Sequence, residues 1–338
     1  MLFWYIFSMA QFVSSFITGF QDVVKSDLHK RFPGIKILNI FDGLIHYQFD
    51  GNSRDLDKII YFNNTFFVLK VFKLKNPTFN AMVGEIASSK NYFLISKGTF
   101  RCRFIQENQF AKVDKNIVKK AEEAVLRNSK LTIDRLSPST EVWYNIRRDG
   151  FAFCGQLISK REFTEKNLNK GELRPEFAYL MCAFAQIEKD AVVAEPFCGY
   201  GSIPIQLAKK IQFNKLYVSD IDDEKISVLK NNKHLQKENI ELSKQDAFSL
   251  NNIEDNSISV VITDPPWGYY EDIADIKAFY DKMFVSFRRI LKADGKMIIL
   301  SARKEDIEKA ASDNGVTILE TVHTLVNGKK AALYKMCF

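Results

Sequence analysis

The residues of this chain best suited to chemistry are Asp264, Pro265, Pro266 and Trp267, in the segment SVVITDPPWG. The β-branched run before them predicts a buried parallel strand, which must end at Asp264 because proline has no N–H for a sheet hydrogen bond. The Asp264 carboxylate would then lie at the carboxyl end of a strand, where open α/β sheets bind ligands. The Asp264 carboxylate is a hydrogen-bond acceptor, the two prolines make a rigid turn, and Trp267 has a flat ring. Together they are suited to bind a planar group that carries an amine. A solvated turn beside a packed Trp is the alternative, and the residues upstream decide between the two.

A second group of residues follows earlier predicted strands. Gly199 and Gly201 stand between a strand and a helix, where glycine lets the backbone turn tightly and approach a ligand. The next strand ends at Asp220, about twenty residues on, which is typical of ribose recognition. A third strand end supplies Asp246. Each acid alone could be an exposed strand-end carboxylate, but together with the glycine loop they predict a nucleoside site.

The loop chemistry narrows the choice of cofactor. A dinucleotide loop would need glycine where this chain has Pro204, and the G-K-[ST] of a phosphate loop is absent. S-adenosylmethionine remains, with Glu195 near its amino-acid moiety, Asp220 on the ribose hydroxyls and Asp246 at the adenine amino group. The predicted cofactor-binding residues are Arg174, Glu195, Pro196, Phe197, Cys198, Gly199, Gly201, Asp220, Ile221, Asp246 and Ala247.

The elements that would position these residues alternate along the second half of the chain. Strands are predicted at 191–197, 215–221, 240–246, 258–264 and 296–302, with helices at 175–188, 203–210, 223–235 and 273–291. A final hairpin, at 316–322 and 331–338, turns at Asn327 and Gly328. This alternation predicts an α/β fold with a doubly wound, mostly parallel sheet of seven strands.

The first half predicts a separate α+β region. A β-α-β-β opening is expected from a strand at about 3–13, an amphipathic helix ending at Arg31, and strands at 35–41 and 43–49. A strand at 98–106, a helix at 115–128 and a hairpin of 141–147 with 151–157 follow, whereas 61–74 fits either a helix or a strand. The predicted domains are 1–60, 61–160, a linker at 161–173, and 174–338.

Positive charge gathers in the first half. Residues 1–170 hold 26 Lys and Arg against 16 Asp and Glu, a net +10, whereas 171–338 hold 22 against 25, a net −3. The asymmetry suggests that the first half binds a polyanion such as tRNA or another structured RNA. Arg147, Arg148, Lys160 and Arg161 are predicted to grip phosphates around the hairpin, with solubilising charge as the alternative.

Other features exclude several classes of protein. The five cysteines stand singly and only four histidines accompany them, so neither a disulfide framework nor a metal site is predicted. Polar residues interrupt the uncharged first 21 positions and helical spacing continues past them, so a buried strand and helix are expected rather than a membrane span. We therefore expect a cytoplasmic monomer, with membrane insertion as the alternative.

Three stretches resemble one family. Residues 171–208, LYVSDID at 216–222 and TDPPWG at 263–268 are similar to the catalytic domain of THUMP-containing Class I RNA methyltransferases, particularly the tRNA guanine-N2 methyltransferases. Residues 131–163 resemble the end of a THUMP module, and the β-α-β-β opening resembles the ferredoxin-like domain that precedes it.

The resemblance implies S-adenosylmethionine-dependent methylation of a guanosine N2 amine in tRNA, with Asp264, Pro265, Pro266 and Trp267 as the catalytic residues. Members commonly carry Tyr or Phe where this chain has Trp267, which puts the size of the base pocket in question. Guanine-N2 methylation of ribosomal RNA, adenine-N6 methylation of nucleic acid, and RNA binding without catalysis remain as alternatives.

Overall fold

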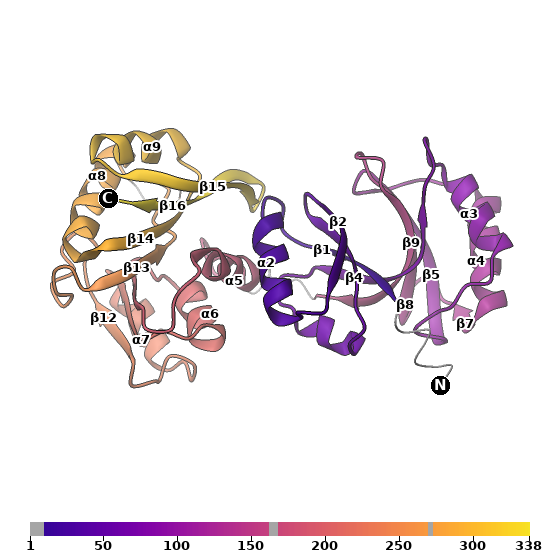
Figure 1. Cartoon of the computed structure of the whole chain (residues 1–338), viewed down its shortest axis with the longest axis horizontal. Coiled ribbons are helices and arrows are strands. Elements are labelled where there is room, and N and C mark those ends of the chain that lie inside the picture. The colour runs from indigo at the N-terminus through magenta and orange to yellow at the C-terminus, as the bar shows by residue number, and fades with distance from the viewer. Residues whose placement is uncertain (1–9, 162–167, 270–272) are drawn as a thin grey trace. The chain divides into compact units, whose positions relative to one another are not determined.

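The computed structural model describes residues 10–161, 168–269 and 273–338 (Figure 1). The chain divides into two compact units: the first comprises the described residues of 1–16 and 28–162, and the second those of 17–27 and 163–338. Much of the strand predicted at 3–13 and of the linker predicted at 161–173 lies outside the described residues.

The first unit is built on a nine-stranded sheet in the order β2-β3-β1-β4-β9-β8-β5-β6, with β7 also paired to β5. Its strands are β1 (Gln11–Ser15), β2 (Lys36–Phe41), β3 (Leu44–Gln48), β4 (Asn64–Phe72), β5 (Lys97–Gln106), β6 (Gln109–Phe110), β7 (Lys130–Ile133), β8 (Thr140–Ile146) and β9 (Ala152–Lys160). Its helices are α3 (Phe79–Ser88), α4 (Lys115–Asn128) and a short 3-10 helix at Ser53–Lys58.

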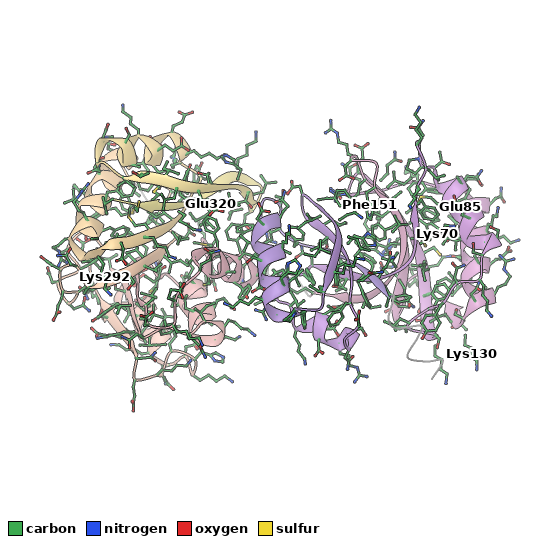
Figure 2. All side chains as sticks on the ribbon, viewed as in Figure 1. Lys70, Glu85, Lys130, Phe151, Lys292 and Glu320 are labelled. Atoms are coloured by element: carbon green, nitrogen blue, oxygen red, sulfur yellow. The ribbon has the colours of Figure 1, made fainter. Side chains whose placement is uncertain are left out.

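Most elements of the first unit follow the local sequence signals. Helix α4 has the predicted bounds, and the Asp114 side chain caps it by accepting from the Asn116 N–H. The ambiguous stretch 61–74 forms β4, which pairs with both β1 and β9, so the sheet runs without a break past the boundary expected at residue 60. Helix α3 was not predicted. It packs with α4 over the sheet, and Lys70 on β4 forms a 2.8 Å ion pair with Glu85 on α3 (Figure 2).

The second unit contains an early piece of the chain. Residues 17–27, with the beginning of helix α2 (Gln21–Arg31), belong to this unit. The ring of Phe20 lies edge-on to Phe177 at 5.4 Å, the Tyr179 hydroxyl donates to Asp27, and Thr324 donates to the carbonyl of Thr18. These contacts join segments far apart in the sequence, so the second unit does not begin at the linker.

Replacing Phe20 by alanine is expected to destabilise the second unit, because the Phe20 side chain is fully buried. The expected loss is about 3 to 5 kcal/mol, typical of a large core truncation. Hydrogen exchange of the amides of the sheet across a urea series measures it. Val285→Ala is the control, because Val285 is 64% exposed and its truncation should cost little. Equal effects of the two substitutions would contradict the packing of Phe20 in this core.

The second unit carries a seven-stranded sheet in the order β12-β11-β10-β13-β14-β16-β15. The first five strands are parallel, and β16 joins β14 and β15 antiparallel. The strands are β10 (Val192–Glu195), β11 (Lys215–Asp220), β12 (Ile240–Lys244), β13 (Ile258–Thr263), β14 (Leu291–Ser301), β15 (Thr317–Val326) and β16 (Lys329–Cys337). The helices are α5 (Pro175–Ala185), α6 (Ser202–Lys210), α7 (Asp223–Lys230), α8 (Ile276–Ile290) and α9 (Lys304–Asp313).

The predicted doubly wound α/β sheet is confirmed, with differences at element ends. Helix α5 ends at Ala185 rather than 188, because Gln186 adopts a left-handed conformation. Helix α7 ends at Lys230 rather than at residue 235. Asn231 and Asn232 begin a turn there, and the Asn232 side chain accepts a hydrogen bond from the His234 N–H. Helix α9 was not predicted.

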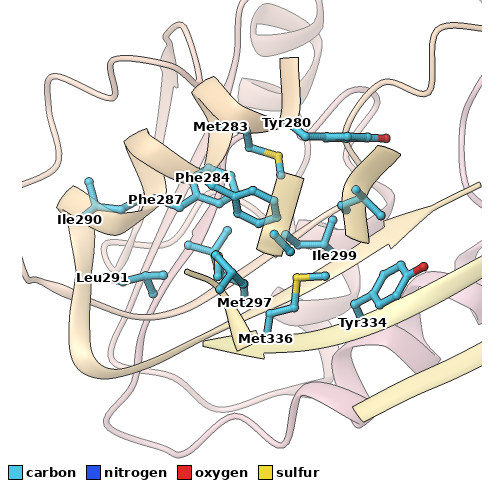
Figure 3. Close-up of a cluster of buried hydrophobic side chains, with 14 of the residues drawn as sticks. Tyr280, Met283, Phe284, Phe287, Ile290, Leu291, Met297, Ile299, Tyr334 and Met336 are labelled. Carbon is cyan, nitrogen blue, oxygen red and sulfur yellow. The ribbon is translucent and has the colours of Figure 1, made fainter. Parts of the chain in front are cut away.

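Both faces of the central strands are buried. Met297 and Ile299 of β14 pack against α8 and α9 in a core that includes Phe284 and Phe287 (Figure 3). Ile298 and Leu300 alternate with them and are also fully buried. Burial on both faces is the arrangement expected of parallel strands that read as continuous apolar runs. No helix in the described part of the chain is long and apolar enough to cross a membrane.

Candidate active site

The predicted strand-end residues meet at one edge of the second sheet. Glu195 is the last residue of β10 and is fully buried. Its Oε1 accepts a 2.8 Å hydrogen bond from the hydroxyl of Thr263, the last residue of β13, and a 3.2 Å bond from the Phe197 N–H. One buried carboxylate therefore connects the predicted cofactor loop with the strand that leads to Asp264.

The glycine loop is shaped by Asp220. The carboxylate of Asp220 accepts from the Gly199 N–H at 2.8 Å and from the Asp222 N–H at 3.0 Å. Gly199 and Gly201 both have positive φ, and a Cβ on Gly201 would lie 2.4 Å from the Leu229 side chain. A Cβ on Gly199 would meet no atom within 4 Å, so that glycine faces open space at the loop. Asp220 thus holds the loop as well as presenting a carboxylate to a ligand.

The remaining loop residues divide into packed and accessible ones. Pro196 and Cys198 are buried, and burial raises the pKa of the Cys198 thiol, so this group stays neutral. Ile221 is 67% exposed directly after Asp220, where an apolar side chain can cover one face of a planar ring. Asp246 is exposed and Ala247 is buried.

Two aromatic residues complete this edge and were not predicted as part of it. Phe248 N–H donates to Asp246, and the Phe248 ring lies 5.1 Å from Phe279 of helix α8. Phe279 also contacts the ring of Phe197 at 5.7 Å. Only folding brings these three rings together, because each comes from a different loop or helix.

Arg174, another predicted cofactor residue, stands beside the loop that precedes helix α5. It is the residue before helix α5 and lines a pocket with the loop 168–172 and the turn between β15 and β16. Its Nε lies 3.5 Å from Glu176. The loop is tied to the start of α6 by a hydrogen bond from Ser202 to the carbonyl of Leu173.

Glu195 fits a positively charged ligand. Burial is the main cause that raises its pKa well above the usual glutamate range, and the charges of Asp264 and Asp220 raise it further, although bonds from Thr263 and Phe197 oppose the shift. Its Oε2 is buried and accepts no hydrogen bond within the described residues. Such an orphaned acceptor suits the ammonium group of S-adenosylmethionine, with Asp220 available for ribose hydroxyls.

Cofactor affinity is expected to rise with pH above the range in which a glutamate ordinarily titrates, about pH 4.3, for as long as the α-ammonium of the ligand keeps its proton. The raised pKa favours the protonated form of Glu195 in the free protein, whereas the cationic ligand favours the carboxylate, so binding is coupled to release of a proton. The dissociation constant should fall by up to about tenfold per pH unit. Calorimetric titration measures it. Glu195→Gln should bind more weakly with a flat profile, and an equally steep profile in that variant would contradict the assignment.

The predicted acceptor turn follows β13 as expected. Asp264 is half-buried and Pro265 is buried, and β13 ends at Thr263. Gly268 has φ +69°, which a side chain would strain, so the chain leaves the turn through a glycine. The Asp264 carboxylate and the Pro265 carbonyl are thus presented by a short, stiff segment at the carboxyl edge of the sheet.

Trp267 is held by two polar contacts that the sequence does not reveal. Its indole N–H donates to the carbonyl of Leu300 at 3.3 Å, and its own carbonyl accepts from Arg303 Nε at 2.9 Å. The Trp267 ring lies edge-on to Tyr269 at 6.3 Å and is half-buried. Thr263 and Arg303 are the polar site residues that sequence reasoning missed, since nothing near either residue in the chain marks it.

The four predicted RNA-binding residues do not form one cluster. Arg147 and Arg148 lie at the turn of the β8–β9 hairpin, near Phe151 in Figure 2, whereas Lys160 and Arg161 lie at the far end of β9. The two ends are about 27 Å apart, at about 3.3 Å per residue. Arg147 donates to Asp149 and to the Asp42 carbonyl, and Arg161 donates to Asn63 and to the Ile60 carbonyl. Arg148 and Lys160 are exposed.

Sequence comparison matches the second half of the chain to a known family. The profile of the family described as "RMKL-like, methyltransferase domain" matches residues 161–331. The U6 snRNA (guanine-N(2))-methyltransferase THUMPD2 of Bos taurus is 28% identical over 131 residues, which cover 38% of this chain and 25% of the relative. A tRNA (guanine(10)-N2)-dimethyltransferase of Methanothermobacter thermautotrophicus is 25% identical over 202 residues, covering 56% of this chain and 59% of the relative.

Structural comparison covers nearly the whole chain. TrmN from Thermus thermophilus matches with a TM-score of 0.78 over 97% of this chain and 99% of that chain, at 17% identity. At this identity the likeness concerns the fold. The chain spans less than two thirds of the length of either curated relative.

Proposed function

Because the chain belongs to the RMKL-like methyltransferase domain family, we propose that it transfers a methyl group to the N2 amine of a guanosine in RNA, with tRNA as the substrate class. The observation that carries the proposal is the adjacency of Asp264 to the cofactor loop through the Thr263–Glu195 hydrogen bond. Two relatives, both named as guanine-N2 methyltransferases, support the choice of base and amine.

S-adenosylmethionine, the cofactor, supplies an electrophilic methyl group. Glu195 would hold its ammonium group, Asp220 its ribose hydroxyls and Asp246 its adenine amine, while Ile221 covers the ring. The Asp220 carboxylate also accepts a hydrogen bond from the Gly199 N–H, which holds the glycine loop beside the residues proposed for these contacts.

The acceptor turn orients the base. An exocyclic amine is a poor nucleophile because its lone pair is delocalised into the ring. Hydrogen bonds from the amine to the Asp264 carboxylate and the Pro265 carbonyl direct that lone pair at the methyl carbon, and the prolines keep both acceptors in place. Trp267, fixed by Leu300 and Arg303, offers its ring to the flipped-out base. After transfer, Asp264 takes the proton that leaves the nitrogen.

The first unit would bind the body of the RNA as a THUMP-like module. Support comes from the net +10 charge of residues 1–170 and from the exposure of Arg148 and Lys160. Arg147 and Arg161 hold the fold in this proposal, because each donates to backbone carbonyls within the unit.

Mass spectrometry of nucleosides tests the proposed reaction. Purified protein and S-adenosylmethionine are incubated separately with unmodified tRNA transcripts, a U6 snRNA transcript and ribosomal RNA. N2-methylguanosine should form in the tRNA arm. Product in another arm alone would replace tRNA as the substrate, and N6-methyladenosine in place of N2-methylguanosine would overturn the assignment of the base.

A further inference from the structure

Arg103, on strand β5 of the first unit, carries a buried donor that the surrounding residues leave unused. Its Nε–H has no acceptor in the part of the chain that the structure describes. The Oε1 atom of Glu141, on strand β8, lies 3.6 Å from that nitrogen, which is too far for a hydrogen bond. A buried donor without an acceptor destabilises a fold, so a ligand that accepts from Arg103 would relieve this cost.

The carboxylate of Glu141 is already engaged by two other groups. Its Oε1 accepts from Arg101 Nε at 2.7 Å, and its Oε2 accepts from the Trp143 indole N–H at 2.6 Å. Burial raises the pKa of Glu141, but the bonds from Trp143 and Arg101 and the charges of Arg101 and Arg103 lower it overall, so this group stays ionised. One carboxylate therefore serves two guanidinium groups, and these three charged side chains together carry a net +1.

Arg103 and Trp143 lie on the sheet face opposite to helices α3 and α4. The two residues are paired in register across β5 and β8. Their chain neighbours Phe104 and Tyr144 point the other way, into the core that includes α3 and α4. On its own face, Trp143 packs against Phe66, with 5.1 Å between the ring centres. The Arg103 guanidinium is therefore presented by the side of the sheet that α3 and α4 do not cover.

An exposed aromatic ring stands next to this guanidinium. Phe110 lies on β6, the edge strand of the sheet, and is 66% exposed. The central carbon of the Arg103 guanidinium lies 4.7 Å from the centre of the Phe110 ring, and the Trp143 ring lies edge-on to Phe110 at 6.4 Å. The cation–π contact holds the guanidinium in place, while much of the Phe110 ring stays accessible.

A buried acceptor without a partner lies on the same face. Asn145 follows Trp143 by two residues of β8, so its side chain points to the same side of the sheet. It is 7% exposed, and its Oδ1 accepts no hydrogen bond from the described residues. In register it pairs with Ile105, which pairs in turn with Phe110. A ligand that satisfies both Arg103 and Asn145 must carry acceptors as well as donors.

An unpaired nucleotide has the chemistry that this face complements. Its base is a flat ring that stacks on exposed aromatic side chains, and its edges carry donors and acceptors. Its phosphate accepts two parallel hydrogen bonds from a guanidinium. An acidic peptide would also satisfy Arg103, but it would leave the Phe110 ring without a flat partner. The net positive charge and the exposed ring together favour single-stranded RNA.

We propose that Phe110, Arg103 and Trp143 form a site for an unpaired nucleotide of the RNA substrate, with its base stacked on Phe110 and its phosphate bound by Arg103. Trp143 fixes the cluster through its bond to Glu141, and Asn145 offers an acceptor to the base. The inference rests on the proposed function and adds to it a single-strand site on the sheet face of the first unit.

Phe110→Ala tests the stacking, with Tyr92→Ala as the matched control. Tyr92 is an exposed aromatic residue of the same unit, and it contacts Phe67, which alternates with Phe66 and so lies on the other face of β4. The full-length protein is titrated against a short fluorescent oligoadenylate, and binding is measured by anisotropy. Phe110→Ala should weaken binding about tenfold, and Phe110→Tyr should restore it. Equal affinities of Phe110→Ala and Tyr92→Ala would overturn the proposal.

Arg103→Gln tests the phosphate contact, with Lys119→Gln as the matched loss of one charge. Lys119 lies on α4, on the other side of the sheet, and its side chain is 76% exposed. Arg103→Gln should weaken oligoadenylate binding about tenfold and reduce the slope of log affinity against log salt by about 0.7. Arg103→Lys should keep the slope but lose part of the affinity, because it lacks the planar fork. Identical slopes and affinities in Arg103→Gln and Lys119→Gln would contradict the phosphate contact.

Further readouts separate the occupant of the site and the proposed reaction. Binding of labelled polyglutamate that is lost in Phe110→Ala would make an acidic peptide the occupant and overturn the proposal. If Phe110→Ala loses oligoadenylate binding and the wild-type protein methylates no RNA, the reaction is wrong and the site stands. If the wild-type protein forms N2-methylguanosine and Phe110→Ala binds oligoadenylate like Tyr92→Ala, the reaction stands and the site is wrong.

Discussion

Asp264→Ala is expected to lower the rate of methyl transfer at saturating substrates by about 10³-fold or more, while the Kd for S-adenosylmethionine stays close to that of the wild type. The reason is that Asp264 follows β13 on a proline-stiffened turn, outside the loop that Asp220 organises. The alanine variant keeps both prolines but loses the acceptor that aligns the amine. Single-turnover methylation of RNA, with calorimetric titration of the cofactor, measures both quantities.

Asp264→Asn is the matched control for this experiment. The amide keeps one acceptor oxygen of nearly the same shape but carries no charge and takes up no proton. If positioning dominates, its loss should be intermediate, about 10- to 100-fold. An asparagine variant as slow as the alanine variant would shift the main role of Asp264 to proton acceptance. Full turnover in Asp264→Ala would contradict the mechanism.

Asp220→Ala is expected to weaken cofactor binding by about 100-fold or more, because a charged hydrogen-bond acceptor contributes about 1.5 to 3 kcal/mol per bond. The substitution removes the acceptor for the Gly199 and Asp222 N–H groups and the one proposed for the ribose. Rates at saturating cofactor should fall much less than in Asp264→Ala. Isothermal titration of the cofactor and single-turnover rates are compared between the two variants. Asp220→Ala should have the larger effect on the cofactor Kd, and Asp264→Ala the larger effect on the rate.

Asp222→Ala provides the control for Asp220. Asp222 lies two residues on and caps helix α7 by accepting from the Glu224 N–H. Its loss should cost about 1 kcal/mol of stability, as for other N-caps, without a large change in cofactor affinity. Equal effects of both substitutions on the cofactor Kd would show that the loop, rather than a specific contact, had been disturbed.

The sequence alone determined the second sheet and the residues at its carboxyl edge. Strand, glycine loop and helix follow one another within a few residues from Ala191 to Lys210, so local signals are sufficient there. The same holds for β13 and the proline turn, because proline ends a parallel strand wherever it stands. Asp220 and Asp246 follow from the same rule, since parallel strands end at one edge.

Sequence patterns were less informative where local preference is weak. Residues 61–74 are rich in aromatic and β-branched side chains and became strand β4 only by pairing with β1 and β9. The basic residues of the β8–β9 hairpin looked like one cluster because they are close in sequence. An extended strand separates them in space, however, so Arg148 and Lys160 lie near its opposite ends.

The tertiary structure decided what holds Asp264, Pro265, Pro266 and Trp267 in place. The carboxylate of Glu195 meets Thr263 across 68 positions, Arg303 reaches the Trp267 carbonyl across 36, and Thr324 binds the Thr18 carbonyl across 306. Composition and spacing cannot reveal such pairs, because they depend on which elements pack together. The sequence therefore determined which groups could meet an amine, and packing decided that Trp267 is fixed through its own N–H and carbonyl, with Tyr269 and Arg303 beside it.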